Sequence, residues 1–127
     1  MPSHKIATVL LSLLLVTTAY AVDEVAPIDF CKDMSIIAKE IMTARQKNKP
    51  MSETLPIALD RYQDLVDRYG IELDTEVEMN EAVAELVMDA YARPSFGMKE
   101  NQRHEISTFE NYIFEACYKA ATFDSKE

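Results

Sequence analysis

The chain has 127 residues and two cysteines, and its 22 acidic and 13 basic residues give a formal net charge of −9. This length suits one domain and is short for two. The negative charge argues against nucleic acid and anionic membrane surfaces as partners, because both repel an acidic protein. It is compatible with a basic protein partner, although acidic surfaces also serve simply to keep proteins soluble.

The N-terminus has the pattern of a cleavable signal peptide. Lys5 gives a positive start, residues 6–16 are almost entirely apolar, and Ala19-Tyr20-Ala21 is the small-x-small sequence that signal peptidase recognises. An uncleaved membrane anchor is the alternative, but the apolar segment is shorter than the ~20 residues that span a bilayer. We therefore expect residues 1–21 to be removed. The mature protein is then periplasmic or secreted, with no stable membrane anchor.

Residues 22–28 are predicted to form a short flexible leader, and the first helix follows it. Asp29 is the expected N-cap, and the helix continues to about Lys47. Its apolar residues recur at helical spacing: Phe30, Met34, Ile37 and Ile41. The segment Asn48-Lys49-Pro50 then ends the helix.

The second predicted helix opens at Ser52 and continues to Gly70. Pro56 is compatible with it, because the first turn of a helix has amide donors to spare. Gly70 is the residue expected just past the end of the helix, where glycine takes the left-handed conformation without a steric cost.

The third predicted helix begins with a capping box, in which the Thr75 hydroxyl and the Glu78 carboxylate each pair with an otherwise unpaired amide. This helix continues to Ala92. Pro94 ends it, since the residue before a proline is pushed out of the helical region. The fourth predicted helix covers residues 99–122.

The whole pattern predicts an all-α protein, with a single domain over residues 29–123 and a flexible tail over 124–127. Four amphipathic helices joined by short turns favour an up-down four-helix bundle. In an exported chain, Cys31 and Cys117 are expected to form a disulfide. The bundle topology independently brings this pair together, because the start of the first helix and the end of the last lie at the same end.

Four motifs lie along the mature chain: Cys31, Ile41-Met42-x-x-Arg45-Gln46, Ala90-Tyr91-x-x-Pro94 and Cys117. Together with the signal peptide, they resemble a group of small exported hypothetical proteins found in proteobacteria and their phages. The resemblance implies an exported compartment and a helical fold. It carries over no functional residues.

The sequence supplies no catalytic or metal-binding motif, and we predict no cofactor. His104 is the one histidine of the mature chain and is expected to be an ordinary exposed residue, while a disulfide would occupy both candidate thiol nucleophiles. A di-iron bundle needs Glu-x-x-His pairs, whereas Glu100 and His104 are four residues apart. A calcium-binding EF-hand loop fails at Leu65, where an oxygen ligand is required.

Two surface features are candidates for partner binding. The first is an acidic stripe on the third helix: Glu78, Glu81, Glu85 and Asp89. We favour its interpretation as a solvated outer face, with a docking surface for a basic partner as the alternative. The second is the loop over residues 93–98, in which three residues have side chains common at binding hot spots: Arg93, Phe96 and Met98. A phenylalanine in such a loop more often packs under its own turn.

Arg45, near the end of the first helix, is expected to cap carbonyl groups and to complement the helix dipole. A partly buried ion pair that bridges two helices is the functional alternative.

The sequence therefore favours a non-catalytic protein-interaction module of the cell envelope, such as an inhibitor, an immunity factor or a phage-encoded modulator of an envelope component. Two alternatives remain open. One is a periplasmic holdase chaperone that responds to acid or stress through its many carboxylates. The other, and the least favoured, is a small hydrolase.

Overall fold

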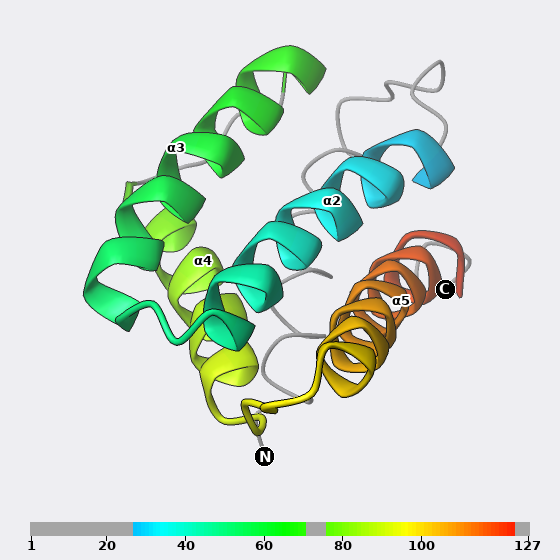
Figure 1. Cartoon of the computed structure of the whole chain (residues 1–127). Coiled ribbons are helices and arrows are strands. Elements are labelled where there is room, and N and C mark those ends of the chain that lie inside the picture. The colour runs from blue at the N-terminus through cyan, green and yellow to red at the C-terminus, as the bar shows by residue number, and fades with distance from the viewer. Residues whose placement is uncertain (1–26, 71–75, 124–127) are drawn as a thin grey trace.

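A computed structural model describes residues 27–70 and 76–123. They form four helices: α2 (Pro27–Gln46), α3 (Met51–Tyr69), α4 (Glu76–Tyr91) and α5 (Lys99–Phe123) (Figure 1). The described residues contain no strand, and the predicted all-α fold is confirmed. The predicted signal peptide, the Thr75 cap, the side chain of Glu78 and the tail over 124–127 lie outside what the structure describes.

The first described helix starts earlier than its sequence indicated. α2 begins at Pro27, two residues before the predicted N-cap Asp29. A proline is well suited to the first turn, because the amide that it lacks has no partner there in any case. The sequence pattern missed this turn because Ile28 is about half exposed and adds nothing to the buried stripe.

α2 ends as predicted at the segment 48–50, and the structure supplies the mechanism. Asn48 takes the left-handed conformation with φ of 59°, which asparagine tolerates better than most residues. The amide of Lys49 donates to the carbonyl of Ala44 at 3.0 Å, and the amide of Asn48 donates to that of Arg45 at 2.9 Å. These two bonds satisfy carbonyl groups that the helix end would otherwise leave unpaired.

α3 begins at Met51, one residue before the predicted opening at Ser52, and its N-cap Pro50 makes no side-chain cap hydrogen bond. Its C-terminus agrees with the prediction. Gly70 has φ of 65°, and its amide donates to the carbonyl of Asp67 at 3.3 Å.

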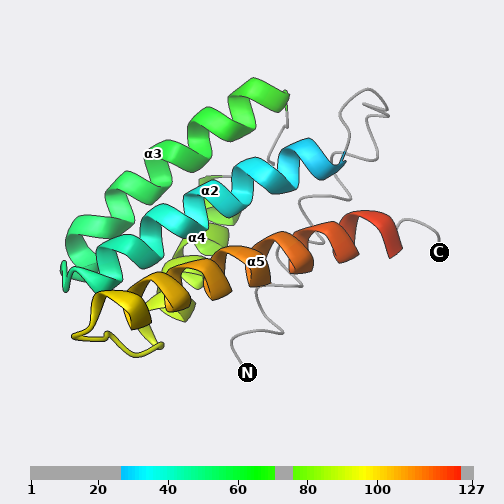
Figure 2. The same ribbon diagram turned by 45° about the vertical axis from the view of Figure 1, so that its right-hand side comes forward.

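α2 is the central helix of the described fold and contacts each of the other three. Figures 1 and 2 both show it between α3 and α5, with α4 behind. The buried core draws on all four helices and includes Phe30, Ile41 and Met42 from α2, Tyr62 and Leu65 from α3, Val83 and Val87 from α4, and Phe109 and Ile113 from α5. Tyr62 is fully buried in this core, with an exposed fraction of 1%.

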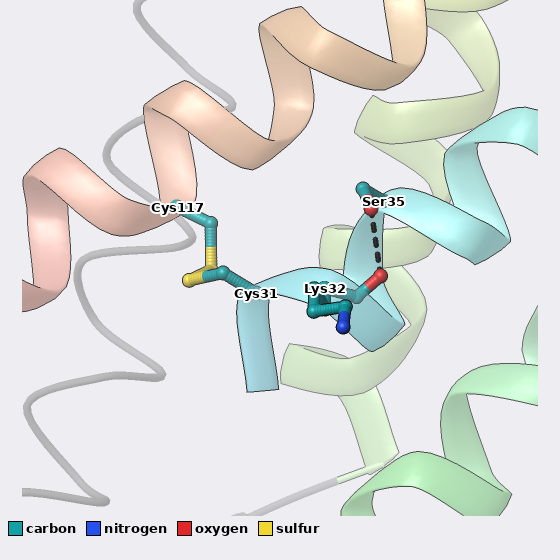
Figure 3. Close-up of a disulfide and its surroundings, with 4 residues drawn as sticks. All are labelled: Cys31, Lys32, Ser35 and Cys117. Atoms are coloured by element: carbon teal, nitrogen blue, oxygen red, sulfur yellow. Dashed lines mark hydrogen bonds between the residues drawn. A yellow bond between two sulfur atoms is a disulfide. The ribbon is translucent and has the colours of Figure 1, made fainter. Parts of the chain in front are cut away.

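The predicted disulfide joins the start of α2 to the end of α5. Cys31 and Cys117 are fully buried, with their Cα atoms 5.6 Å apart (Figure 3). One turn further along α2, the buried Ser35 hydroxyl donates to the carbonyl of Lys32 at 2.6 Å, so this polar group is satisfied inside its own helix. The bundle topology brings the cysteines together as the sequence indicated.

None of the helices in the described part of the chain carries an apolar stretch long enough to cross a bilayer.

Candidate functional site

The acidic stripe predicted on α4 divides into residues with different surroundings. Glu81 is exposed and Glu85 half-buried, whereas Asp89 is buried, with an exposed fraction of 7%. The interpretation as a solvated outer face is therefore wrong at Asp89. The sequence could not reveal this, because the burial depends on how α4 packs and on where the next loop places Arg93.

Arg93, a candidate for partner binding in the sequence, is instead engaged within the fold, and only 26% of its side chain is exposed. Its guanidinium lies 3.6 Å from the carboxylate of Asp89 and 3.6 Å from that of Glu105. It also lies over two aromatic rings of α5, 4.9 Å from the centroid of Phe109 and 5.1 Å from that of Tyr112. Both acidic partners are largely buried, so this cation fastens the end of α4 onto α5 and is occupied by its own fold.

Burial raises the pKa of the Asp89 carboxyl above its ordinary value of 3.8, and the positive charge of Arg93 opposes that shift. The charged form is thus disfavoured in the folded protein on balance. A buried carboxyl already paired with an arginine offers little to a basic partner, which leaves Glu81 and Glu85 as the accessible part of the described stripe.

Phe96, the second of the predicted loop residues, belongs to another contact region, which we call the junction. It is where the end of α2 meets the chain that follows α4, and it comprises Arg45, Gln46, Tyr91, Arg93, Pro94 and Phe96.

Gln46 is the central residue of the junction and has an exposed fraction of only 2%. Its side-chain amide donates to the carbonyl of Pro94 at 2.9 Å, and its Oε1 accepts the backbone amide of Phe96 at 2.9 Å. One side chain therefore satisfies a donor and an acceptor of the loop. Sequence reasoning overlooked Gln46, although it falls four residues after Met42 and so continues the buried stripe of α2.

Arg45 caps a carbonyl group, as predicted, but one that lies far away in sequence. Its Nε donates at 3.0 Å to the carbonyl of Arg93, 48 residues further along the chain, and its guanidinium lies 5.5 Å from the centroid of the Tyr91 ring. The Tyr91 hydroxyl donates to the carbonyl of Lys49 at 2.7 Å. Since a phenol has one proton, the hydroxyl of Thr54 donates to Tyr91 in their 2.7 Å contact.

The two internal motifs that carried the resemblance, residues 41–46 and 90–94, thus meet at the junction and hold the fold together. Within the loop, Phe96 is half-buried, whereas Met98 is 65% exposed and is free to meet a partner. His104 is exposed on α5, as expected.

The structure shows a hollow that the sequence did not predict: a groove of about 330 Å³ between α2 and α3. Volumes of this order are typical of ligand sites in proteins. Apolar residues of both helices line it: Ile37, Ile41 and Ala44 from α2, and Ile57 and Ala58 from α3. Past Arg61 it meets a second hollow of about 180 Å³, whose lining includes Ile36 and Arg68. We call the two hollows together the α2–α3 groove.

Ion pairs cross and flank the groove. Arg61 of α3 pairs with Glu40 of α2 at 3.2 Å, and these two residues line both hollows. At the far end Arg68 lies 3.1 Å from the carboxylate of Asp33, which also accepts the Tyr69 hydroxyl at 2.7 Å. The hydrogen bond to Asp33 is the second cause, after burial, that raises the pKa of Tyr69 to about 12. The Arg61–Glu40 pair is well exposed, so it contributes little stability and is open to exchange for a partner's charges.

The charge around the first hollow is opposite in sign to that of the whole chain. Four basic and two acidic residues line it: Lys39, Lys47, Lys49 and Arg61, with Glu40 and Glu53. Among the residues that the structure describes, Lys39, Lys47 and Lys49 have no carboxylate partner for their ammonium groups. The groove also leaves apolar surface uncovered, because Ile57 is 54% exposed and Ile36 is 48% exposed.

Across the described ranges, no group of three or more His, Cys, Asp or Glu side chains is arranged to hold a metal ion. The chain matches no family model, no curated protein sequence and no solved structure. What the arrangement offers chemically is an apolar floor with free ammonium groups beside it, which suits binding of an amphipathic, negatively charged surface.

Proposed function

We propose that this protein is an exported, non-catalytic interaction module of the cell envelope, and that it holds a protein partner in the α2–α3 groove. The observation that carries this proposal is the contrast within the groove, where half-exposed isoleucines lie beside lysines whose ammonium groups have no carboxylate partner among the described residues. Apolar surface rimmed by charge is typical of protein interaction sites.

The signal-peptide pattern supports the envelope location, and the disulfide is consistent with it, since such bonds persist in oxidising compartments. An inhibitor, an immunity factor or a modulator of an envelope component would each use a surface of this kind. The groove replaces the loop and the acidic stripe as the first candidate surface, because Arg93 and Asp89 are occupied by each other.

The acid-responsive chaperone gains no support from Asp89. Its folded pKa is raised above 3.8, so the cost of burying the charge is present at neutral pH and is lost as the pH falls from the raised pKa toward 3.8. Acidification therefore relieves this site, whereas an acid-triggered opening would need carboxylates with lowered pKa values.

The test is capture of partners from bacterial envelope extract on the full mature protein, compared with two variants. Ile57→Glu places a charge on the groove floor, and Met98→Glu makes the same kind of change on an exposed methionine outside it. We expect a captured protein that Ile57→Glu loses and Met98→Glu retains. Equal capture by both variants would remove the groove from the proposal.

The location is tested separately by N-terminal sequencing of the protein from a periplasmic fraction. We expect a mature chain that begins at Val22. An uncleaved chain that stays in the cytoplasm would contradict the envelope assignment.

A further inference from the structure

We propose that the occupant of the α2–α3 groove is an acidic amphipathic helix of the partner protein, lying along the groove with its carboxylates over the end formed by Lys47 and Lys49. This inference rests on the proposed function and specifies the partner's chemistry.

The shape of the groove favours a rod. Its lining extends along α2 from Asp33 to Lys47 and along α3 from Glu53 to Arg68. At the helical rise per residue, each stretch is about 20 Å long. A trough of that length between two helices matches a helix of about 14 residues, since a third helix packs naturally into the furrow between two others.

The walls of the groove select a helix over an extended peptide. Both walls are α-helices, which use their backbone amides and carbonyls internally. An extended segment in the groove would find few backbone partners, and unpaired buried amides are costly. A helix brings its own hydrogen bonds and needs only apolar side chains to contact Ile57 and Ile36, one in each hollow.

The charges around the first hollow indicate that the partner's contacting surface is negatively charged. The chain carries a net charge of −9, yet four of the six charged residues around the first hollow are basic. Lys47 also offsets the negative end of α2, but Lys39 lies in the middle of the helix, where the dipole effect has faded. Its ammonium, like that of Lys49, has no carboxylate partner in the described chain.

The charges also set the orientation. In the second hollow Arg61 and Arg68 are already paired with Glu40 and Asp33. Of the three lysines without a carboxylate partner in the described chain, Lys47 and Lys49 lie at one end of the groove, near the connection between α2 and α3, and Lys39 lies near its middle. Carboxylates of the partner helix belong over that end, and complementary charge of this kind fixes register and speeds association.

The probes are two designed helical peptides of about 14 residues with the same leucine stripe, one flanked by glutamates and the other by lysines at one end. Binding to the full, disulfide-bonded mature protein is measured by fluorescence anisotropy. We expect the glutamate peptide to bind. Its affinity should fall as the salt concentration rises from about 0.05 to 0.5 M, because salt screens the interactions between exposed charges. The lysine peptide should bind at least about tenfold more weakly.

The matched variants separate the groove from general charge. The double variant Lys39→Glu with Lys47→Glu should weaken binding of the glutamate peptide about tenfold. It should also reverse the preference, so that the lysine peptide binds more tightly. Lys32→Glu with Lys99→Glu makes the same change in net charge at exposed lysines outside the groove and should leave the preference as it was. Circular dichroism of each variant checks that the helices are retained.

Two results would overturn the inference. One is equal binding of both peptides, or a preference that the groove variant does not alter. The other is displacement of the glutamate peptide by dodecanoate at lower concentration than the peptide itself requires, which would make the occupant a fatty acid. If the peptides fail while Ile57→Glu still abolishes capture from envelope extract, the helix is wrong and the groove's binding role stands.

Discussion

The two flanks of α2 differ in how completely their side chains are used. On the side that meets α5 and the chain after α4, a disulfide fixes the start of the helix, and Arg45 and Gln46 fix its end with bonds to loop carbonyls and an amide. Along α3, by contrast, exposed ion pairs cross a hollow in which isoleucines remain half uncovered. The buried Gln46 side chain is paired with the loop, whereas the Arg61–Glu40 pair is exposed. The flank along α3 is therefore where the surface can change without unfolding the protein.

The largest expected effect comes from removing the disulfide. Cys31→Ala with Cys117→Ala opens a loop of 86 residues and should cost about 4 kcal/mol of unfolding free energy. Chemical denaturation followed by circular dichroism measures it, and reduction of the wild-type protein should give a loss of similar size. A loss below about 1 kcal/mol would show that the polar junction suffices without the covalent bond.

Arg93→Met should destabilise the protein by about 3 kcal/mol at neutral pH, because it leaves the carboxylates of Asp89 and Glu105 buried without their cation. The control is Arg103→Met, an exposed arginine on the same helix as Glu105, for which little change is expected.

The loss of unfolding free energy caused by Arg93→Met should depend on pH. Without the arginine, nothing opposes the burial that raises the pKa of Asp89. The cost of the charged carboxyl is fully present above that raised pKa and is lost as the pH falls toward 3.8. Unfolding free energies at pH 7 and pH 4 should therefore differ less between variant and wild type at the lower pH. A deficit that grew on acidification would contradict the assigned direction.

Gln46→Ala should cost about 2 kcal/mol, since it removes a buried side chain and leaves the partly buried amide of Phe96 and carbonyl of Pro94 without their partner. Gln63→Ala, which removes an exposed hydrogen bond to Asp67 within α3, is the control and should cost far less. Equal losses would mean that the junction contributes no more than an ordinary helix surface.

The smallest expected change is at the groove. Ile57→Ser should alter the unfolding free energy by no more than about 0.5 kcal/mol, because the side chain is more than half exposed. The same variant should weaken partner capture. A large loss of stability would show that Ile57 belongs to the core, and the contrast between the two flanks of α2 would fail.

The sequence predicted the helices, their ends at Asn48 and Gly70, and the Cys31–Cys117 pairing. These features depend on local chemistry: apolar spacing, residues that accept the left-handed conformation, and a chain topology that places the two cysteines at one end.

The sequence did not predict what depends on three-dimensional placement. Asp89 has the spacing of an exposed carboxylate and is buried because the loop returns Arg93 to it. Gln46 is polar, yet it is buried because it hydrogen-bonds to the carbonyl of Pro94, 48 residues away. The groove depends on how far apart α2 and α3 lie. The spacing of apolar residues predicts which residues are buried, but it does not predict that distance. Its exposed Ile36 and Ile57 lie off the buried stripes and were the available signal.

The position of the disulfide has a mechanical consequence. Because it joins residues 86 positions apart, it turns almost the whole helical body into a closed ring. Force applied at residues outside the ring passes through the sulfur–sulfur bond and leaves α3 and α4 unloaded. About 300 Å of contour length is thereby withheld from stretching at the usual span per residue.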